Sequence, residues 1–267
     1  MLQDIIRHKR EEVAHRKKRY PLELLQESPH YSAPCISLCR YLRREDRIGI
    51  IAEFKRKSPS NGSLGYRPSV ESVSIGYMQA GASALSVLTD NHFFGGSHAD
   101  LKTARSYNFC PILCKDFMID PYQLHEARSY GADAVLLIAA VLQPAEISDM
   151  VAAAHELGME TIIEIHTAGE IAAIDPETEI IGVNNRDLTS METSLATSIN
   201  LAGDLPEGPL RISESGIRNA RDILELKALD YQGFLIGTHF MRSGDPKQAC
   251  QELIAAVRMA SSEITAA

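Results

Sequence analysis

Residues 122–165 read YQLHEARSYGADAVLLIAAVLQPAEISDMVAAAHELGMETIIEI and contain two kinds of segment in alternation. Helix-forming stretches, Tyr122 to Tyr130 and Pro144 to Leu157, each end at a glycine, which is a common helix stop. The runs Ala134 to Ile138 and Thr161 to Ile165 are nearly all apolar, as in parallel strands covered on both faces. The segment therefore predicts a repeating strand and helix unit.

The same alternation extends in both directions along the chain. Further apolar runs occupy 48–54, 84–88, 111–114, 180–183, 210–212 and 233–236, so there are eight in all. Eight such units predict an α/β fold, a (βα)₈ TIM barrel over residues 48–260, within a single domain of residues 1–267. A doubly wound open sheet is the alternative, but no G-x-G-x-x-G or Walker sequence follows any strand.

Residues 1–47 precede the first predicted strand. A charged helix is expected from Leu2 to Lys18, followed by a loop region around Pro21, Pro29 and Pro34. We expect this segment to be an N-terminal helical extension of the single barrel domain.

Composition excludes several classes of protein. The 267 residues carry 27 basic and 35 acidic side chains, a formal net charge of −8, which argues against a general nucleic-acid or membrane binder. The charged first twenty residues do not resemble a secretory signal, so we expect a cytoplasmic protein. Five cysteines without paired spacing favour buried thiols over disulfides or zinc, and no metal site is expected.

Polar side chains gather where the predicted strands end. Barrel enzymes carry their chemistry at the carboxyl ends of the strands, so these side chains are expected to meet at one mouth. In chain order they are Glu53 and Lys55, Lys115, Glu164, Asn184, Ser215 with Gly216, and Gly237 with Thr238.

Two of these residues suggest acid–base chemistry. Glu164 stands between Ile163 and Ile165, so its carboxylate is expected to be partly enclosed and tuned as an acid or base. A structural ion pair would explain it equally well. Lys115 is expected on the same side as Leu113, as a general acid, a Schiff-base former or a salt-bridge partner. Glu53 and Lys55 are two apart and should point the same way.

The turns after the seventh and eighth strands suggest a phosphate site. Barrel enzymes often bind phosphate there, although Gly216 and Gly237 also fit ordinary tight turns. Ser58, with Lys55 and Arg56, could close the site from the first loop. The aromatic and histidine side chains near these turns are interpreted from their residue type alone. Phe94 and Phe117 would suit an aromatic substrate, whereas His166 and His239 are expected to be loop or packing residues.

Together these residues resemble the indole-3-glycerol-phosphate synthase family, whose members are TIM barrels. The resemblance covers about residues 48–243, and its most specific stretches are 51–60 and 114–122. Other matching stretches are 86–90, 93–97, 131–138, 163–167, 182–188, 214–217 and 234–237. The opening helix also resembles the family's extension over the barrel mouth. Asp90 and Thr238-His239 depart from the usual family pattern.

The resemblance implies a carboxy-lyase of tryptophan biosynthesis. It would close the ring of 1-(2-carboxyphenylamino)-1-deoxyribulose 5-phosphate with loss of CO₂ and water, without a cofactor. Lys115 would be the general acid, Glu164 the general base for dehydration, and Lys55 the carboxylate binder that can share acid duty. Glu53 and Asn184 would orient these groups and the substrate hydroxyls.

The remaining assignments concern substrate binding, and they too are implied by the resemblance. Phe94, Phe117 and Leu136 would line an aromatic slot, and Arg186 would support the substrate carboxylate. Phosphate would be held by Ser58, Ser215, Gly216, Gly237 and Thr238, with Glu214 also in the binding site. The expected partner is thus a phosphorylated aromatic small molecule. The sequence leaves the oligomeric state open between a monomer and a homodimer.

Three other functions fit parts of the pattern. A phosphoribosylanthranilate isomerase would share the barrel and phosphate site, but it needs no Glu53-x-Lys55 pair. A Schiff-base aldolase could use Lys115, and borohydride trapping would reveal its adduct. A non-catalytic phosphate-binding barrel could keep both glycine turns, but the retained Lys55, Lys115 and Glu164 argue against it.

Overall fold

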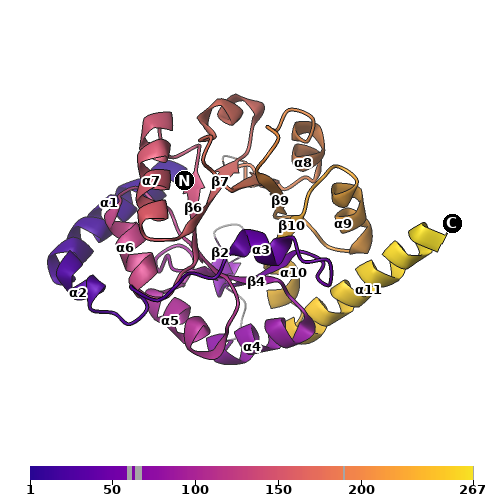
Figure 1. Cartoon of the computed structure of the whole chain (residues 1–267), viewed down its shortest axis with the longest axis horizontal. Helices are drawn as coiled ribbons and strands as arrows, with labels where there is room; N and C mark the ends of the chain where they lie inside the picture. Colours follow the sequence, from indigo (N-terminus) through magenta and orange to yellow (C-terminus); the bar gives the residue numbers. More distant parts are fainter. Residues whose placement is uncertain (59–61, 64–67, 189, 267) are drawn as a thin grey trace.

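The computed structural model of the chain describes residues 1–58, 62–63, 68–188 and 190–266. Eight parallel strands close into a barrel in the order β1-β10-β9-β8-β7-β6-β5-β4, and helices surround them (Figure 1). The barrel strands are β1 (Ile50–Phe54), β4 (Ala84–Leu88), β5 (Ile112–Lys115), β6 (Ala134–Ile138), β7 (Glu160–Ile165), β8 (Ile180–Asn184), β9 (Leu210–Glu214) and β10 (Gly233–Ile236). The predicted TIM barrel is confirmed, and the open sheet is excluded.

Strand β6 shows why the predicted strands are apolar throughout. Leu136 and Ile138 point into the barrel and pack with Leu113 and Ile162, while Val135 faces the surrounding helices. Because protein covers both faces of the strand, apolar residues do not alternate with polar ones along it, and both faces are apolar. A similar division holds around the ring, so each apolar run stabilises two layers of the core at once.

Helices follow the strands in sequence and cover the outside of the barrel. Capping residues set their ends. Ser69 accepts a hydrogen bond at the start of α4, and Gly81, at φ +105°, ends it. The α-helices are α4 (Val70–Ala80), α5 (His98–Tyr107), α6 (Tyr122–Ser129), α7 (Pro144–Glu156), α8 (Ala196–Leu201), α9 (Ala220–Lys227), α10 (Thr238–Met241) and α11 (Pro246–Ala266). None of the helices in the described part of the chain is long and apolar enough to cross a membrane.

The unit after β7 departs from the predicted pattern. Its helix is a 3₁₀ helix, η1 (Ala168–Ala173), rather than an α-helix. Pro176 follows closely and disfavours helical backbone at Asp175, so little room is left for further turns. The first loop also holds an antiparallel pair that the sequence did not predict, in which β2 (Lys57–Ser58) faces β3 (Gly62–Ser63).

The N-terminal extension contacts both ends of the barrel. Its helices are α1 (Leu2–Arg19), α2 (Leu22–Gln26) and α3 (Leu38–Leu42), and the last two lie in the region expected to be loop. Leu38 and Leu42 join the interior core near Leu210, so α3 closes the amino end of the barrel (Figure 1). Ile5 of α1 packs with Phe117 at the opposite end, the mouth.

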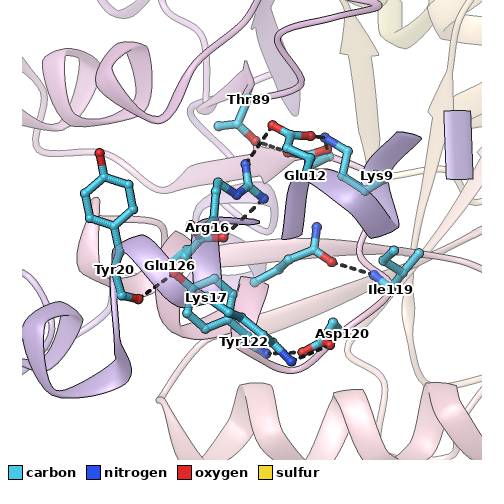
Figure 2. A network of polar contacts seen from close by, with 12 residues as sticks. Lys9, Glu12, Arg16, Lys17, Tyr20, Thr89, Ile119, Asp120, Tyr122 and Glu126 are labelled. Atoms are coloured by element: carbon cyan, nitrogen blue, oxygen red, sulfur yellow. Dashed lines mark hydrogen bonds and ion pairs between the residues drawn. The ribbon is translucent and has the colours of Figure 1, made fainter. Parts of the chain in front are cut away.

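A buried polar network attaches α1 to the barrel (Figure 2). Lys9 is fully buried, and its Nζ lies 2.8 Å from carboxylate oxygens of Glu12, Asp90 and Asp116. Arg16, one turn of α1 further on from Glu12, pairs with Glu12 and with Glu126 of α6. Asp116 directly follows β5 and Asp90 lies two residues beyond β4, so α1 is fixed against the mouth loops.

Candidate active site

A cavity of about 910 Å³ opens at the carboxyl ends of the strands. It brings together most of the residues predicted to act there, which come from all eight barrel strands or the loops that follow them. Those lining it are Glu53, Lys55, Phe94, Lys115, Phe117, Leu136, Glu164, Asn184, Arg186, Glu214, Ser215, Gly216 and Thr238. The side chain of the other predicted residue of the first loop, Ser58, lies outside the part of the chain that the structure describes.

Lys115 stands at the end of β5 between two buried carboxylates. Its Nζ lies 3.1 Å from Oε2 of Glu164 and 2.5 Å from Oε2 of Glu214. Burial lowers the pKa of Lys115, but Glu164, Glu214 and Glu53 attract the proton more strongly, so the pKa lies above its ordinary value. The ammonium is therefore the resting form.

The two carboxylates beside Lys115 differ in their proton affinity. Burial raises the pKa of Glu164, but Lys115 and then His166 outweigh burial, so this pKa falls below its ordinary value. Burial also raises the pKa of Glu214. Lys115 lowers this pKa only in part, because the negative charges of Glu164 and Glu53 repel the Glu214 carboxylate, so the pKa stays above its ordinary value. Glu214 was predicted in a substrate-binding role, and the structure places it as a direct partner of Lys115. Two groups of opposite tendency beside one ammonium suit proton transfer.

Glu53 and Lys55 point into the cavity as the period-two pattern predicted. Lys55 Nζ lies 2.7 Å from Oε1 of Glu53, which is itself buried. Gly237, predicted in the phosphate site, is absent from the cavity lining and backs the Glu53 carboxylate instead. A Cβ at Gly237 would collide with Glu53, so this glycine permits a close approach.

Arg56 does not join Lys55 at the cavity, contrary to the prediction that it helps close the phosphate site. Its guanidinium pairs with Asp100 at 2.5 Å and lies over the ring of Phe54. The physical reason is alternation, because the side chain after Lys55 leaves the strand on the opposite side.

The apolar side of the cavity is built by Phe94, Phe117 and Leu136. The ring centroids of Phe94 and Phe117 are 6.0 Å apart. Asp90 Oδ1 accepts hydrogen bonds from the backbone N–H groups of Phe93 and Phe94, at 2.7 and 3.1 Å. The network around Lys9 thus also fixes the backbone that carries Phe94.

The loop after β9 has an unusual backbone. Ser215 has φ +68° and Gly216 has φ +79°, and a residue other than glycine is uncommon in this region. Asn185 supports this loop by donating from Nδ2 to the Ser215 carbonyl at 3.0 Å and to Ser213 Oγ at 2.9 Å. Thr238 begins α10 on the neighbouring unit. Such a supported, strained loop is typical of a binding site.

Asn184 and Arg186 extend the rim of the cavity. Asn184 Oδ1 accepts a hydrogen bond from the Arg186 backbone N–H at 3.0 Å. Arg186 in turn donates from Nε to Thr193 Oγ1 at 3.3 Å. Residues that face the cavity therefore also hold together the described parts of the segment between β8 and α8.

Comparison with known proteins gives the family. A sequence model described as "Indole-3-glycerol phosphate synthase" matches residues 2–253. The chain belongs to the indole-3-glycerol phosphate synthase family. Among its relatives, the synthase of Bacteroides thetaiotaomicron is 43% identical over 97% of this chain and 99% of its own. That of Beutenbergia cavernae is 39% identical over 96% of this chain and 95% of its own.

Solved structures support the fold alone. The 3-hexulose-6-phosphate synthase of Salmonella typhimurium has a TM-score of 0.62 at 12% identity and covers 79% of this chain and 99% of its own. Tryptophan synthase subunit alpha of Legionella pneumophila has a TM-score of 0.60 at 14% identity, covering 85% of this chain and 97% of its own. The indole-3-glycerol phosphate synthase family supplies the function, a decarboxylating carboxy-lyase of tryptophan biosynthesis that acts on a phosphorylated small molecule.

Sequence reasoning missed several residues of this synthase site. Ile5 and Leu2 of α1 line the cavity, as do Arg218 and Arg242. Asn185 could have been identified from the sequence, because it directly follows Asn184 at the end of a predicted strand. Arg218 lies two residues beyond Gly216 and could have been found in the same way. The resemblance did place the opening helix over the mouth, but no short-range pattern shows which residues of α1 line the cavity.

Proposed function

We propose that Lys115 is the general acid and Glu164 the general base of this synthase. The observation that carries the proposal is the position of Lys115 Nζ, 3.1 Å from Glu164 and 2.5 Å from Glu214, on the wall of the cavity. Ring closure needs a proton at the ribulose carbonyl oxygen as the new carbon–carbon bond forms, and the ammonium of Lys115 can supply it. Loss of water then needs a base that removes a proton as the hydroxyl departs, which Glu164 can do.

The electrostatics of Lys115 favour an acid over a nucleophile. A Schiff base forms only from the neutral amine, and the flanking carboxylates hold the Lys115 pKa above its ordinary value. When Glu164 takes up a proton, part of that attraction disappears and Lys115 holds its own proton less tightly. The two residues can therefore transfer protons in a coupled way.

The other residues are proposed to bind and orient the substrate. Lys55 and Arg186 would hold its carboxylate, with Glu53 and Asn184 orienting Lys55 and the substrate hydroxyls. An aromatic ring would enter between Phe94, Phe117 and Leu136. The phosphate would lie on the loops that carry Ser58, Ser215, Gly216, Gly237 and Thr238, with Arg218 and Arg242 as additional cations beside it.

Three general predictions about the protein belong to the same proposal. Residues 1–267 would form a single domain, in which residues 1–47 extend the barrel of residues 48–260 by the contacts of α1 and α3 at its two ends. The protein would act in the cytoplasm, as a monomer or a homodimer.

A turnover assay tests the proposed roles. Purified protein is mixed with 1-(2-carboxyphenylamino)-1-deoxyribulose 5-phosphate, and indole fluorescence is followed for wild type, Lys115→Ala and Glu164→Gln. Losing a positioned acid or base typically costs about two to four decades in rate. If wild type turns over and either variant keeps more than about a tenth of its kcat, the role given to that residue is wrong.

A further inference from the structure

His166 lies directly behind the candidate base. It follows β7 and is two residues beyond Glu164, so an extended backbone places both side chains on the same side. Its Nε2 lies 3.3 Å from Oε1 of Glu164, and its Nδ1 lies 3.5 Å from Oε2 of Glu170. The side chain is 7% exposed, and His166 is absent from the cavity lining whereas Glu164 lines it.

We propose that His166 is a positioning residue that holds Oε1 of Glu164, so that Oε2, beside Lys115, is the oxygen that exchanges the proton. The two oxygens of Glu164 already have different partners, His166 on Oε1 and Lys115 on Oε2. An oxygen that faces an imidazolium at 3.3 Å is a poor place for an incoming proton, because protonation would remove their attraction. This inference rests on the proposed role of Glu164 as the general base.

Glu170 fixes the imidazole from the other side. Its Oε2 accepts a hydrogen bond from the His166 backbone N–H at 2.6 Å and from the Thr167 backbone N–H at 3.4 Å. These contacts cap η1 and hold the Glu170 carboxylate in place independently of the imidazole ring. A carboxylate behind a histidine fixes the ring orientation and stabilises the protonated form, as in other acid–base sites.

The charges around the two residues agree with this arrangement. Glu164 faces Lys115 of β5, His166 and, beyond Lys115, Glu214 of β9, while His166 faces Glu164 and Glu170. Burial lowers the His166 pKa, but hydrogen bonds and attraction from these two carboxylates outweigh burial and raise it to about 10. His166 is then an imidazolium in neutral solution, and both of its ring nitrogens are donors.

A double-mutant cycle tests whether His166 acts through Glu164. His166→Gln should lower kcat at least about tenfold while leaving KM within about threefold, because the ring does not reach the cavity. In the Glu164→Gln background the same substitution should change kcat by less than about twofold. If His166→Gln causes an equal loss in both backgrounds, or no loss in wild type, the proposal is wrong.

The pH profile gives a readout that a merely structural role would not move. Removing the imidazolium takes away a positive charge and a donor, so the Glu164 pKa should rise and the acidic limb of kcat/KM should move to higher pH. Glu170→Gln keeps an acceptor for the η1 cap and leaves the imidazolium protonated at acidic pH, so it should not move the limb to higher pH. An unmoved limb in His166→Gln contradicts the proposal even if the enzyme is slower.

Histidine protonation can also be measured without turnover. In ¹⁵N-histidine spectra, His166 should stay protonated at both nitrogens at pH 8 in wild type and lose this signature in Glu164→Gln. His155 is a matched control, since its Nε2 lies 2.8 Å from Glu179 at the opposite end of the barrel. His155→Gln should leave kcat and the pH profile unchanged.

The failure of this inference and that of the proposed function give different results. If Glu164→Gln keeps high activity, Glu164 is not the base, whatever His166 does. If Glu164→Gln is inactive but His166 variants show the wild-type profile and signature, only the positioning role falls. Thermal unfolding of each variant identifies those that do not fold, and Glu170→Gln tests the same contact from the other side of the ring.

Discussion

Lys9 Nζ lies 2.8 Å from Oδ1 of Asp116, the residue that directly follows Lys115 in the chain. A lysine of the first helix is thus in contact with the segment that carries the candidate general acid. Thr89 donates to the other oxygen of Asp116 at 2.7 Å, so this carboxylate is held from both sides. The N-terminal extension is thereby part of the support of the active site.

Lys9→Met should lower the free energy of unfolding by about 3 to 5 kcal/mol, because Asp90 and Asp116 would remain buried without their cation. Urea or thermal unfolding measures the loss. Lys17→Met is the matched control on the same helix, where the Lys17–Asp120 pair is largely exposed and is expected to contribute about 1 kcal/mol or less. Equal losses in the two variants would show that the buried network contributes no more than a surface pair.

Glu126→Gln should make stability less dependent on pH. Burial raises the pKa of Glu126 from 4.5 to about 7, so the folded protein binds a proton that the unfolded chain has lost. Stability contributed by this group therefore falls as pH rises through that window. Melting temperatures at pH 5 and pH 8 should differ more in wild type than in Glu126→Gln, whereas exposed Glu225→Gln should follow wild type. Parallel curves for Glu126→Gln would contradict the assignment.

Lys115→Ala should remove most turnover and leave substrate binding within about tenfold, because the phosphate and carboxylate contacts remain. Single-turnover kinetics and equilibrium binding of the substrate separate the two effects. Lys102→Ala, on the exposed face of α5, is the control and should behave as wild type. A folded Lys115→Ala protein that binds substrate more than a hundredfold more weakly would indicate a binding role instead.

Ser215→Asp should raise KM far more than it lowers kcat. The substitution adds a negative charge where the substrate phosphate is proposed to lie, and this interaction is common to the ground and transition states. Steady-state kinetics measure the split, with exposed Ser106→Asp as the charge-matched control. An unchanged KM would place the phosphate elsewhere.

Glu164→Gln should separate the early and late steps of the reaction. The amide keeps the shape of Glu164 but cannot take up a proton, so the ring should close and CO₂ should leave before the reaction stalls at dehydration. In a single turnover with carboxyl-labelled substrate, CO₂ should therefore appear faster than the indole chromophore. Equal slowing of both signals would mean that Glu164 acts at or before ring closure.

Much of the barrel could be predicted from local pattern because each strand is an apolar run with a helix after it. Strands 84–88, 134–138 and 233–236 have the predicted bounds. The short distance between strand ends also explains why Lys115 and Glu164 could be placed together. Backbone alternation correctly predicted that Glu53 and Lys55 point into the same space. The same rule places the side chain of Arg56 on the opposite side, outside the cavity, and the sequence analysis overlooked this.

The rest depended on contacts between distant parts of the chain. Lys9 lies on the helix face between Ile5 and Val13, but the carboxylates that pair with it come from distant segments, and only Lys9 among the lysines of α1 at 9, 17 and 18 is buried. His166 did have a signal, its two-residue spacing from Glu164, but a lone histidine after a strand is usually a loop or packing residue. Gly237 was expected in a phosphate turn, and its contact with Glu53 depends on the pairing of β10 with β1.

The pairing of β1 with β10 also has a consequence during synthesis. Ile50, Ile51 and Ala52 pair with Phe234, Leu235 and Ile236, so the barrel cannot close until the ribosome has made nearly the whole chain. Until then β1 and β9 each present a row of unpaired backbone groups, an arrangement prone to association with other chains. A nascent chain arrested before residue 233 should therefore depend on chaperones, and release of the last strand should be followed by a sharp gain in protease resistance.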